Sequence, residues 1–115
     1  MRSEDLYLTD IYEACVAIEK FAAGTSREQF LQNDLIQSAV VQKLTVIGEA
    51  ASKIGESIRA QHSEVDWQTL VSFRNFLIHV YFHTTMEKVC EAVAEARELG
   101  EHIATIIAHR KGSAN

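Results

Sequence analysis

The sequence contains no proline in 115 residues and only five glycines. Proline and glycine are the residues that a helix interior tolerates least, and turn-rich β-proteins depend on both. Apolar residues make up 47% of the chain, which is enough to form a hydrophobic core in one domain of this length. The chain is therefore predicted to be all-α, with a single domain over residues 1–115.

Apolar residues recur at three- and four-residue spacing in four long segments, as in amphipathic helices. Ser26 and Gln29 match a capping box, which predicts a short extra helix after the first segment. Short connections between the segments favour an antiparallel bundle of four main helices. The long helices are expected at residues 3–23, 34–61, 66–81 and 84–109, before a polar tail at about 110–115.

The predicted inward faces follow these stripes. In the first segment the stripe runs from Tyr7 through Ile11, Ala14 and Ile18 to Phe21. In the third segment it includes Trp67 and Arg74, which places an arginine at a core-facing position. An unpaired guanidinium there would be costly, so a partner, a cleft or a second copy of the chain must compensate.

Gly48 and Gly55 lie seven residues apart in the segment 34–61, the longest predicted helix. A glycine inside a helix costs about 1 kcal/mol relative to alanine unless its missing side chain is used. The favoured use is close approach of another helix. Contact with RNA or a nucleotide is the alternative.

The net charge of −5 disfavours a protein that binds nucleic acid over a broad surface. No DNA contact is expected, and any contact with RNA must be local. No apolar run is long enough to span a membrane, and the acidic N-terminus does not resemble a signal peptide, so we expect a cytoplasmic protein without a membrane partner. An acidic run in the last helix is interpreted as a solvated face: Glu87, Glu91, Glu95, Glu98 and Glu101.

The cysteines and histidines give little support for a metal site. Cys15 and Cys90 lie within helical patterns and are interpreted as small buried hydrophobic residues. His79 and His83 have the one-turn spacing of a ligand pair, but a helix boundary is expected between them and no cysteine is nearby. His102 and His109 are predicted to face solvent, and His62 lies in a loop. We therefore expect neither a metal nor a cofactor.

Arg74, Asn75, His79 and Tyr81 are polar residues in an otherwise apolar stretch. One interpretation is structural: a buried arginine paired with a carboxylate, and a core histidine with its hydrogen bonds satisfied. The other is a phosphodiester site, because arginine can donate two hydrogen bonds to phosphate and histidine transfers protons near neutral pH. The spacing alone does not separate these interpretations.

The segment from Arg74 to Tyr81 resembles the Arg-x4-His-x-Tyr motif of the HEPN superfamily, specifically its HepT-like toxins. The similarity extends to Tyr7-Leu8-Thr9-Asp10-Ile11, to Ile47-Gly48-Glu49-Ala50-Ala51 and to Trp67. Asp66 departs from the family pattern, in which proline is common at this position. The departure affects only how the helix begins.

The resemblance implies a metal-independent endoribonuclease that acts as a homodimer on RNA. It implies a composite site at the dimer interface with Arg74 and His79 as catalytic residues and Asn75 in support. It also implies an antitoxin partner, a minimal nucleotidyltransferase of the MntA type, that transfers AMP to Tyr81. The alternative is a non-catalytic helical partner of a nucleotidyltransferase, in which the motif binds a nucleotide or substrate or only holds the dimer together.

Overall fold

The computed structural model describes residues 2–75 and 86–113, and all regular structure within these ranges is helical. This confirms the predicted all-α class. The elements in chain order are α1 (Glu4–Ala22), α2 (Arg27–Leu31), α3 (Asp34–Ala51), α4 (Glu56–Gln61), α5 (Trp67–Ser72), the 3-10 turn η1 (Phe73–Asn75) and α7 (Met86–Ser113).

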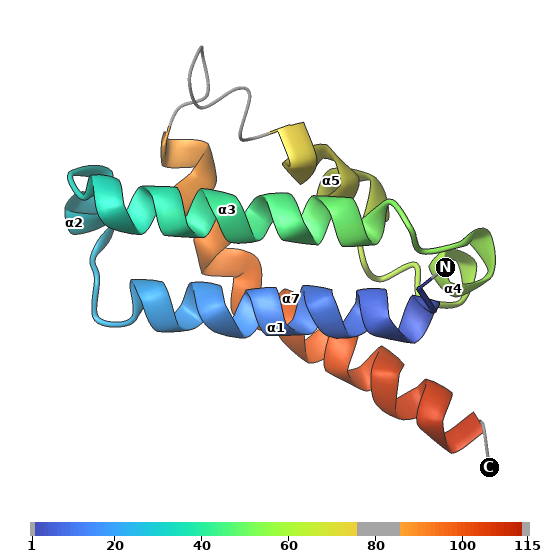
Figure 1. Ribbon diagram of the computed structural model, residues 1–115. Coiled ribbons are helices and arrows are strands. Elements are labelled where there is room, and N and C mark those ends of the chain that lie inside the picture. Colours follow the sequence, from blue (N-terminus) through green and yellow to red (C-terminus); the bar gives the residue numbers. More distant parts are fainter. Residues whose placement is uncertain (1, 76–85, 114–115) are drawn as a thin grey trace.

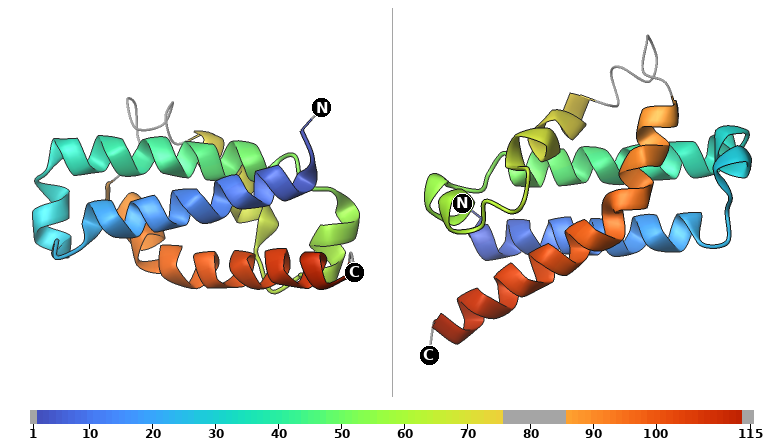
Figure 2. Two further views of the ribbon diagram at one scale, coloured as in Figure 1. Left: turned by 60° about the horizontal axis from the view of Figure 1, so that its bottom comes forward. Right: turned by 180° about the vertical axis from the view of Figure 1, so that it is seen from behind.

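The bundle is arranged around α1. α3 runs antiparallel along one side of α1, and α7 crosses the other side obliquely, as Figures 1 and 2 show from three directions. α5 and η1 pack against α3 (Figure 1), and α2 contacts both α3 and α7. The segment that carries Arg74 is therefore supported mainly by α3.

The centre of the core is formed by apolar side chains from the three long helices and Phe30 of α2, and Ile58, Trp67, Leu70 and Phe73 extend it from α4, α5 and η1. Burial of one such large side chain contributes about 1.5–3 kcal/mol. The large side chains that are fully buried are Leu8, Ile11, Cys15, Ile18, Phe30, Val40, Leu44, Ile47, Val89, Ile103 and Ile106.

The inward face of α1 includes Ile11, Ala14 and Ile18, as predicted, and extends beyond the predicted stripe on the side of Leu8 and Cys15. Phe21 was expected in the core but is 39% exposed, whereas Leu8 and Cys15 are fully buried. α7 packs closely against this face of α1, because a Cβ at Gly100 would lie only 3.2 Å from Cys15 Cβ. α1 therefore turns its Cys15 side toward α7. Burial raises the pKa of the Cys15 thiol to about 12, in agreement with the interpretation of this cysteine as a hydrophobic residue.

The prediction of one helix over residues 34–61 is wrong, because the chain breaks between α3 and α4. Arg59 stabilises the break by donating hydrogen bonds to the carbonyl oxygens of Ile54 and Ala51, at 2.9 and 2.8 Å. The N–H of Gly55 donates to Glu4 Oε2 at 2.6 Å. Gly55 is thus the N-cap of α4 and does not lie inside a helix, and α7, not α3, is the longest described helix.

Four predicted helix starts are confirmed by side-chain caps. Ser3, Asn33 and Asp66 each accept a hydrogen bond from a backbone N–H in the first turn, and Ser26 and Gln29 form the complete capping box. Thr84 and Glu87 also have the sequence spacing of a capping box, but Thr84 lies outside the described ranges. The acidic side chains of α7 are all exposed, as expected, and Cys90 is only partly buried. None of the described helices is long and apolar enough to cross a membrane.

Asp66 begins the helix that leads to Arg74, so its cap can be tested directly. Asp66→Ala is expected to lower the free energy of unfolding by about 1 kcal/mol at about pH 7. The hydroxyl and then the backbone N–H of Thr69 lower the pKa of Asp66 below its ordinary 3.8. Its charge-dependent stabilisation is therefore present above that ordinary value and is lost as the pH falls through the lower, native value.

Urea denaturation at about pH 7 and about pH 3 measures this loss, and the difference between wild type and Asp66→Ala should shrink at the lower pH. Ser26→Ala is the matched control, because it removes a helix cap that does not titrate. A difference for Asp66→Ala that is the same at both pH values would contradict the assigned role of the carboxylate.

Candidate active site around Arg74

Two anchors fix α5 at its start. Asp66 Oδ1 accepts from the Thr69 N–H at 3.1 Å, and Asp66 Oδ2 accepts from the Thr69 hydroxyl at 2.8 Å. The indole N–H of Trp67 donates to the His62 carbonyl oxygen at 3.0 Å, and the Trp67 side chain is only 5% exposed. The direction in which α5 leaves the loop is therefore well defined.

The buried side of this segment continues through Leu70 to Phe73, which are 5% and 8% exposed. Both residues line a cavity of about 270 Å³ between α3, α5 and α7. Carboxylates also line that cavity, among them Glu64, Asp66 and Glu95, so it is unsuited to a phosphate. Arg74 does not line it.

The backbone of Arg74 lies directly on Gly48 of α3. A Cβ atom built on Gly48 would lie 2.3 Å from Arg74 N and 2.9 Å from Arg74 Cα. The predicted use of Gly48, close approach of another helix, is confirmed, and the approaching element is the turn that begins the sequence motif.

Arg74 and Asn75 are exposed, which corrects the prediction that Arg74 faces the core. In a continuous α-helix Arg74 would share a face with Trp67, seven residues earlier. The chain instead tightens into η1 at Phe73. A 3-10 turn advances by three residues per turn, so Phe73 takes the buried position and Arg74 is turned outward.

Most arginine side chains in the described residues have a hydrogen-bond or ion-pair partner, and Arg74 differs from them. Arg2, Arg97 and Arg110 form ion pairs with Asp10, Glu101 and Asp5, and Arg59 caps α3. Within residues 2–75 and 86–113, neither the Arg74 side chain nor the Arg27 side chain has a hydrogen bond or ion pair. The interpretation of Arg74 as a buried arginine paired with a carboxylate is therefore wrong.

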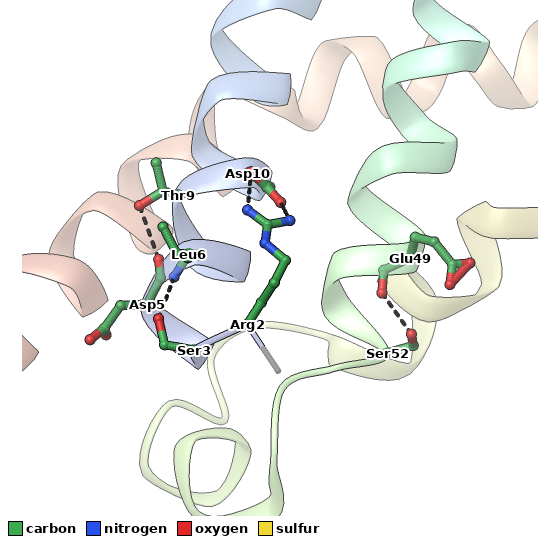
Figure 3. A network of polar contacts seen from close by, with 8 residues as sticks. All are labelled: Arg2, Ser3, Asp5, Leu6, Thr9, Asp10, Glu49 and Ser52. Carbon is green, nitrogen blue, oxygen red and sulfur yellow. Dashed lines mark hydrogen bonds and ion pairs between the residues drawn. The ribbon is translucent and has the colours of Figure 1, made fainter.

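Arg2 shows the contrasting case. It donates to Asp10 at 2.6 Å, as Figure 3 shows, and its guanidinium carbon lies 4.9 Å from the centre of the Tyr7 ring. Arg2, Tyr7 and Asp10 line a groove of about 470 Å³ between α1 and α3, together with Glu49 and Lys53. The positive charge of Arg2 is already neutralised there, so this groove has weaker attraction for a phosphate than its residue types suggest.

His79, Tyr81 and His83 lie outside the described residues, so the catalytic role of His79 and the acceptor role of Tyr81 stay predictions. In the described part of the chain, no group of three or more His, Cys, Asp and Glu side chains is placed to hold a metal ion. His109, which is exposed as predicted, meets His62 edge to face with ring centres 5.8 Å apart.

Phe73, which anchors η1, was not predicted as a buried position. Its ring fixes η1 from the buried side, and the signal was the apolar spacing of Leu70 and Phe73 at one turn. Arg59 was also overlooked, because a side chain that caps a preceding helix has no periodic signature.

Comparison with known proteins supports the sequence resemblance. Residues 11–106 match the family described as Ribonuclease HepT-like. The chain is 36% identical over 94 residues to a Thermococcus cleftensis protein named "Probable ribonuclease HepT", covering 82% of this chain and 86% of that protein. It is 30% identical over 112 residues to a protein of Caldanaerobacter subterraneus subsp. tengcongensis with a provisional name as an RNase, covering 96% and 100%. No solved structure gave a significant match.

The exposure of Arg74 predicts that this side chain contributes little to folding. Arg74→Ala and Asn75→Ala are each expected to change the free energy of unfolding by less than about 0.5 kcal/mol. Phe73→Ala, one residue away, should lower it by about 3 kcal/mol because it empties a buried site. Urea denaturation measures all three. A loss of about 3 kcal/mol or more for Arg74→Ala would instead indicate a buried ion pair.

Proposed function

The chain belongs to the family of HepT-like ribonucleases, and on that premise we propose that it is an endoribonuclease that cleaves RNA without a metal ion. The observation that carries the proposal is the exposed Arg74 guanidinium, which no described carboxylate neutralises. An arginine in this state can donate two parallel hydrogen bonds to a phosphate. The family relationship supplies the class of substrate.

We propose that Arg74 and His79 are the catalytic residues and that Asn75 supports them. Cleavage requires a base that removes the proton from the 2′-hydroxyl, whose oxygen then bonds to phosphorus. An acid must protonate the departing 5′-oxygen, and cations must stabilise the charge that develops on the phosphate oxygens. The products are a 2′,3′-cyclic phosphate and a 5′-hydroxyl.

The proposed site is shared by two copies of the chain in a homodimer. One chain offers a single motif histidine, whereas the reaction uses both a base and an acid. A twofold axis that brings two motifs together would supply two histidines and two arginines in one cleft. The exposure of Arg74 and Asn75 supports this arrangement, because these side chains remain accessible on the surface of one copy.

In the cell, we propose that the protein acts in the cytoplasm as the toxin of a toxin-antitoxin pair. The unpaired Cys15 and Cys90 suit a reducing compartment. The proposed antitoxin is an MntA-type nucleotidyltransferase that transfers AMP to Tyr81. An adenylyl group two residues from His79 would add bulk and negative charge where the RNA phosphate must bind.

Substitution of the two proposed catalytic residues should abolish cleavage without unfolding the protein. Arg74→Ala and His79→Ala are each expected to reduce the rate of RNA cleavage by about 100-fold or more. The assay uses purified protein with a chelator present and identifies the cyclic phosphate by mass spectrometry. Light scattering coupled to size-exclusion chromatography checks that the dimer remains.

Arg27→Ala and His102→Ala are the matched controls. Arg27 is the other exposed arginine without a partner in the described ranges, and His102 lies on α7 beside Glu98. Both variants should cleave at the wild-type rate. Cleavage that survives Arg74→Ala and His79→Ala, or that requires added divalent metal, would overturn the proposed mechanism.

The proposed antitoxin reaction is tested by intact mass after co-expression with an MntA-type nucleotidyltransferase. The mass should increase by whole adenylyl groups, and Tyr81→Phe should abolish the increase. Tyr12→Phe is the control, because Tyr12 is an exposed tyrosine on α1. A modification that persists in Tyr81→Phe, or that Tyr12→Phe removes, would exclude Tyr81 as the acceptor.

A further inference from the structure

We propose that Gly48 is a positioning residue for Arg74: the absence of a side chain at Gly48 determines where the arginine leaves the protein surface. This inference rests on the proposed function, because it assigns Gly48 a role in the same site. The observation that supports it does not depend on that function: α3 contacts the backbone of η1 directly.

The contact leaves no room for any side chain at position 48. A Cβ there would lie 2.3 Å from Arg74 N, 2.9 Å from Arg74 Cα and 3.0 Å from Arg74 Cβ. Non-bonded carbon atoms pack at about 3.5–4.0 Å. Even alanine would therefore displace the Arg74 backbone by about 1 Å.

The displaced atoms belong to the backbone or lie next to it, so rotation of the Arg74 side chain cannot relieve the clash. Substitution of Arg74 cannot relieve it either, because the closest atom is the backbone nitrogen that every residue has. The absence of a side chain at Gly48 thus makes room for the backbone of η1, and not for the arginine side chain.

The displacement must be absorbed by η1, because α3 is fixed. Leu44, Ile47 and Ala51 flank Gly48 on α3 and are at most 1% exposed, so that helix cannot retreat without disrupting the core. Phe73 holds η1 from its buried side and is 8% exposed. Arg74 is therefore held between a glycine on one helix and the anchor that precedes it.

This placement matters for catalysis because a guanidinium that stabilises developing charge must be positioned before the reaction. A misplacement of about 1 Å can reduce a rate by about 100-fold. If Arg74 acts mainly on the transition state, Gly48→Ala should lower kcat while changing KM little. A purely structural role for Gly48 predicts instead a loss of folded protein with kcat per folded molecule unchanged.

Gly100→Ala is the matched control. Gly100 is also a buried helical glycine, and its added Cβ would lie 3.2 Å from Cys15 Cβ, between α7 and α1. The Gly100→Ala substitution strains the packing of α7 against α1 and does not contact η1. Gly112→Ala, which meets nothing within 4 Å, controls for the exchange of glycine for alanine itself.

The experiment measures kcat and KM for RNA cleavage, thermal unfolding, and hydrogen–deuterium exchange over residues 67–75 for each variant. Gly48→Ala is expected to lower kcat by about 10- to 100-fold and to accelerate exchange over residues 67–75. Gly100→Ala should keep kcat within about threefold of wild type, even if it lowers Tm as much.

Wild-type kcat in Gly48→Ala, unchanged exchange over residues 67–75, or an equal loss of kcat in Gly100→Ala would each overturn the positioning role. If Gly48→Ala does not fold, Phe73→Leu loosens the same turn from its buried side, and an unchanged kcat in that variant overturns the proposal. If the wild type does not cleave RNA, the proposed function fails, and the exchange measurement still decides whether Gly48 positions η1.

Discussion

The burial of α1 between α3 and α7 is the interaction on which the rest of the structure depends. Leu8, Ile11, Cys15 and Ile18 supply a face that water does not reach, and both neighbouring helices pack against it. This fixes α3 in place, and α3 in turn supports α5 and η1. The exposed Arg74 is thus supported from the core through α3, against which η1 packs.

The sequence was sufficient to predict the fold class and most helix starts, because both follow from local chemistry. The apolar periods and the capping residues Ser3, Ser26 and Asn33 act within one helix turn. The break after α3 was not predictable in this way. It depends on Glu4 and Arg59, and the hydrogen bond from Gly55 to Glu4 joins residues that are far apart in the chain.

The close approach at Gly48 was predictable from the sequence, but the orientation of Arg74 was not. Helical periodicity assumes a constant angle per residue and therefore placed Arg74 in the core. The change to a 3-10 turn at Phe73 moves Arg74 outward, and that change depends on packing against α3, which no local pattern records. The same limit applies to Phe21, which the periodic stripe placed in the core and which is 39% exposed.

The charge distribution has a consequence for how such a protein would encounter RNA. With a net charge of −5, the surface attracts no broad layer of phosphates, and three of the arginines are already neutralised by carboxylates. Proteins that slide along nucleic acid rely on a basic surface that releases counterions. A protein without such a basic surface would instead sample RNA by separate collisions, so each encounter would be brief.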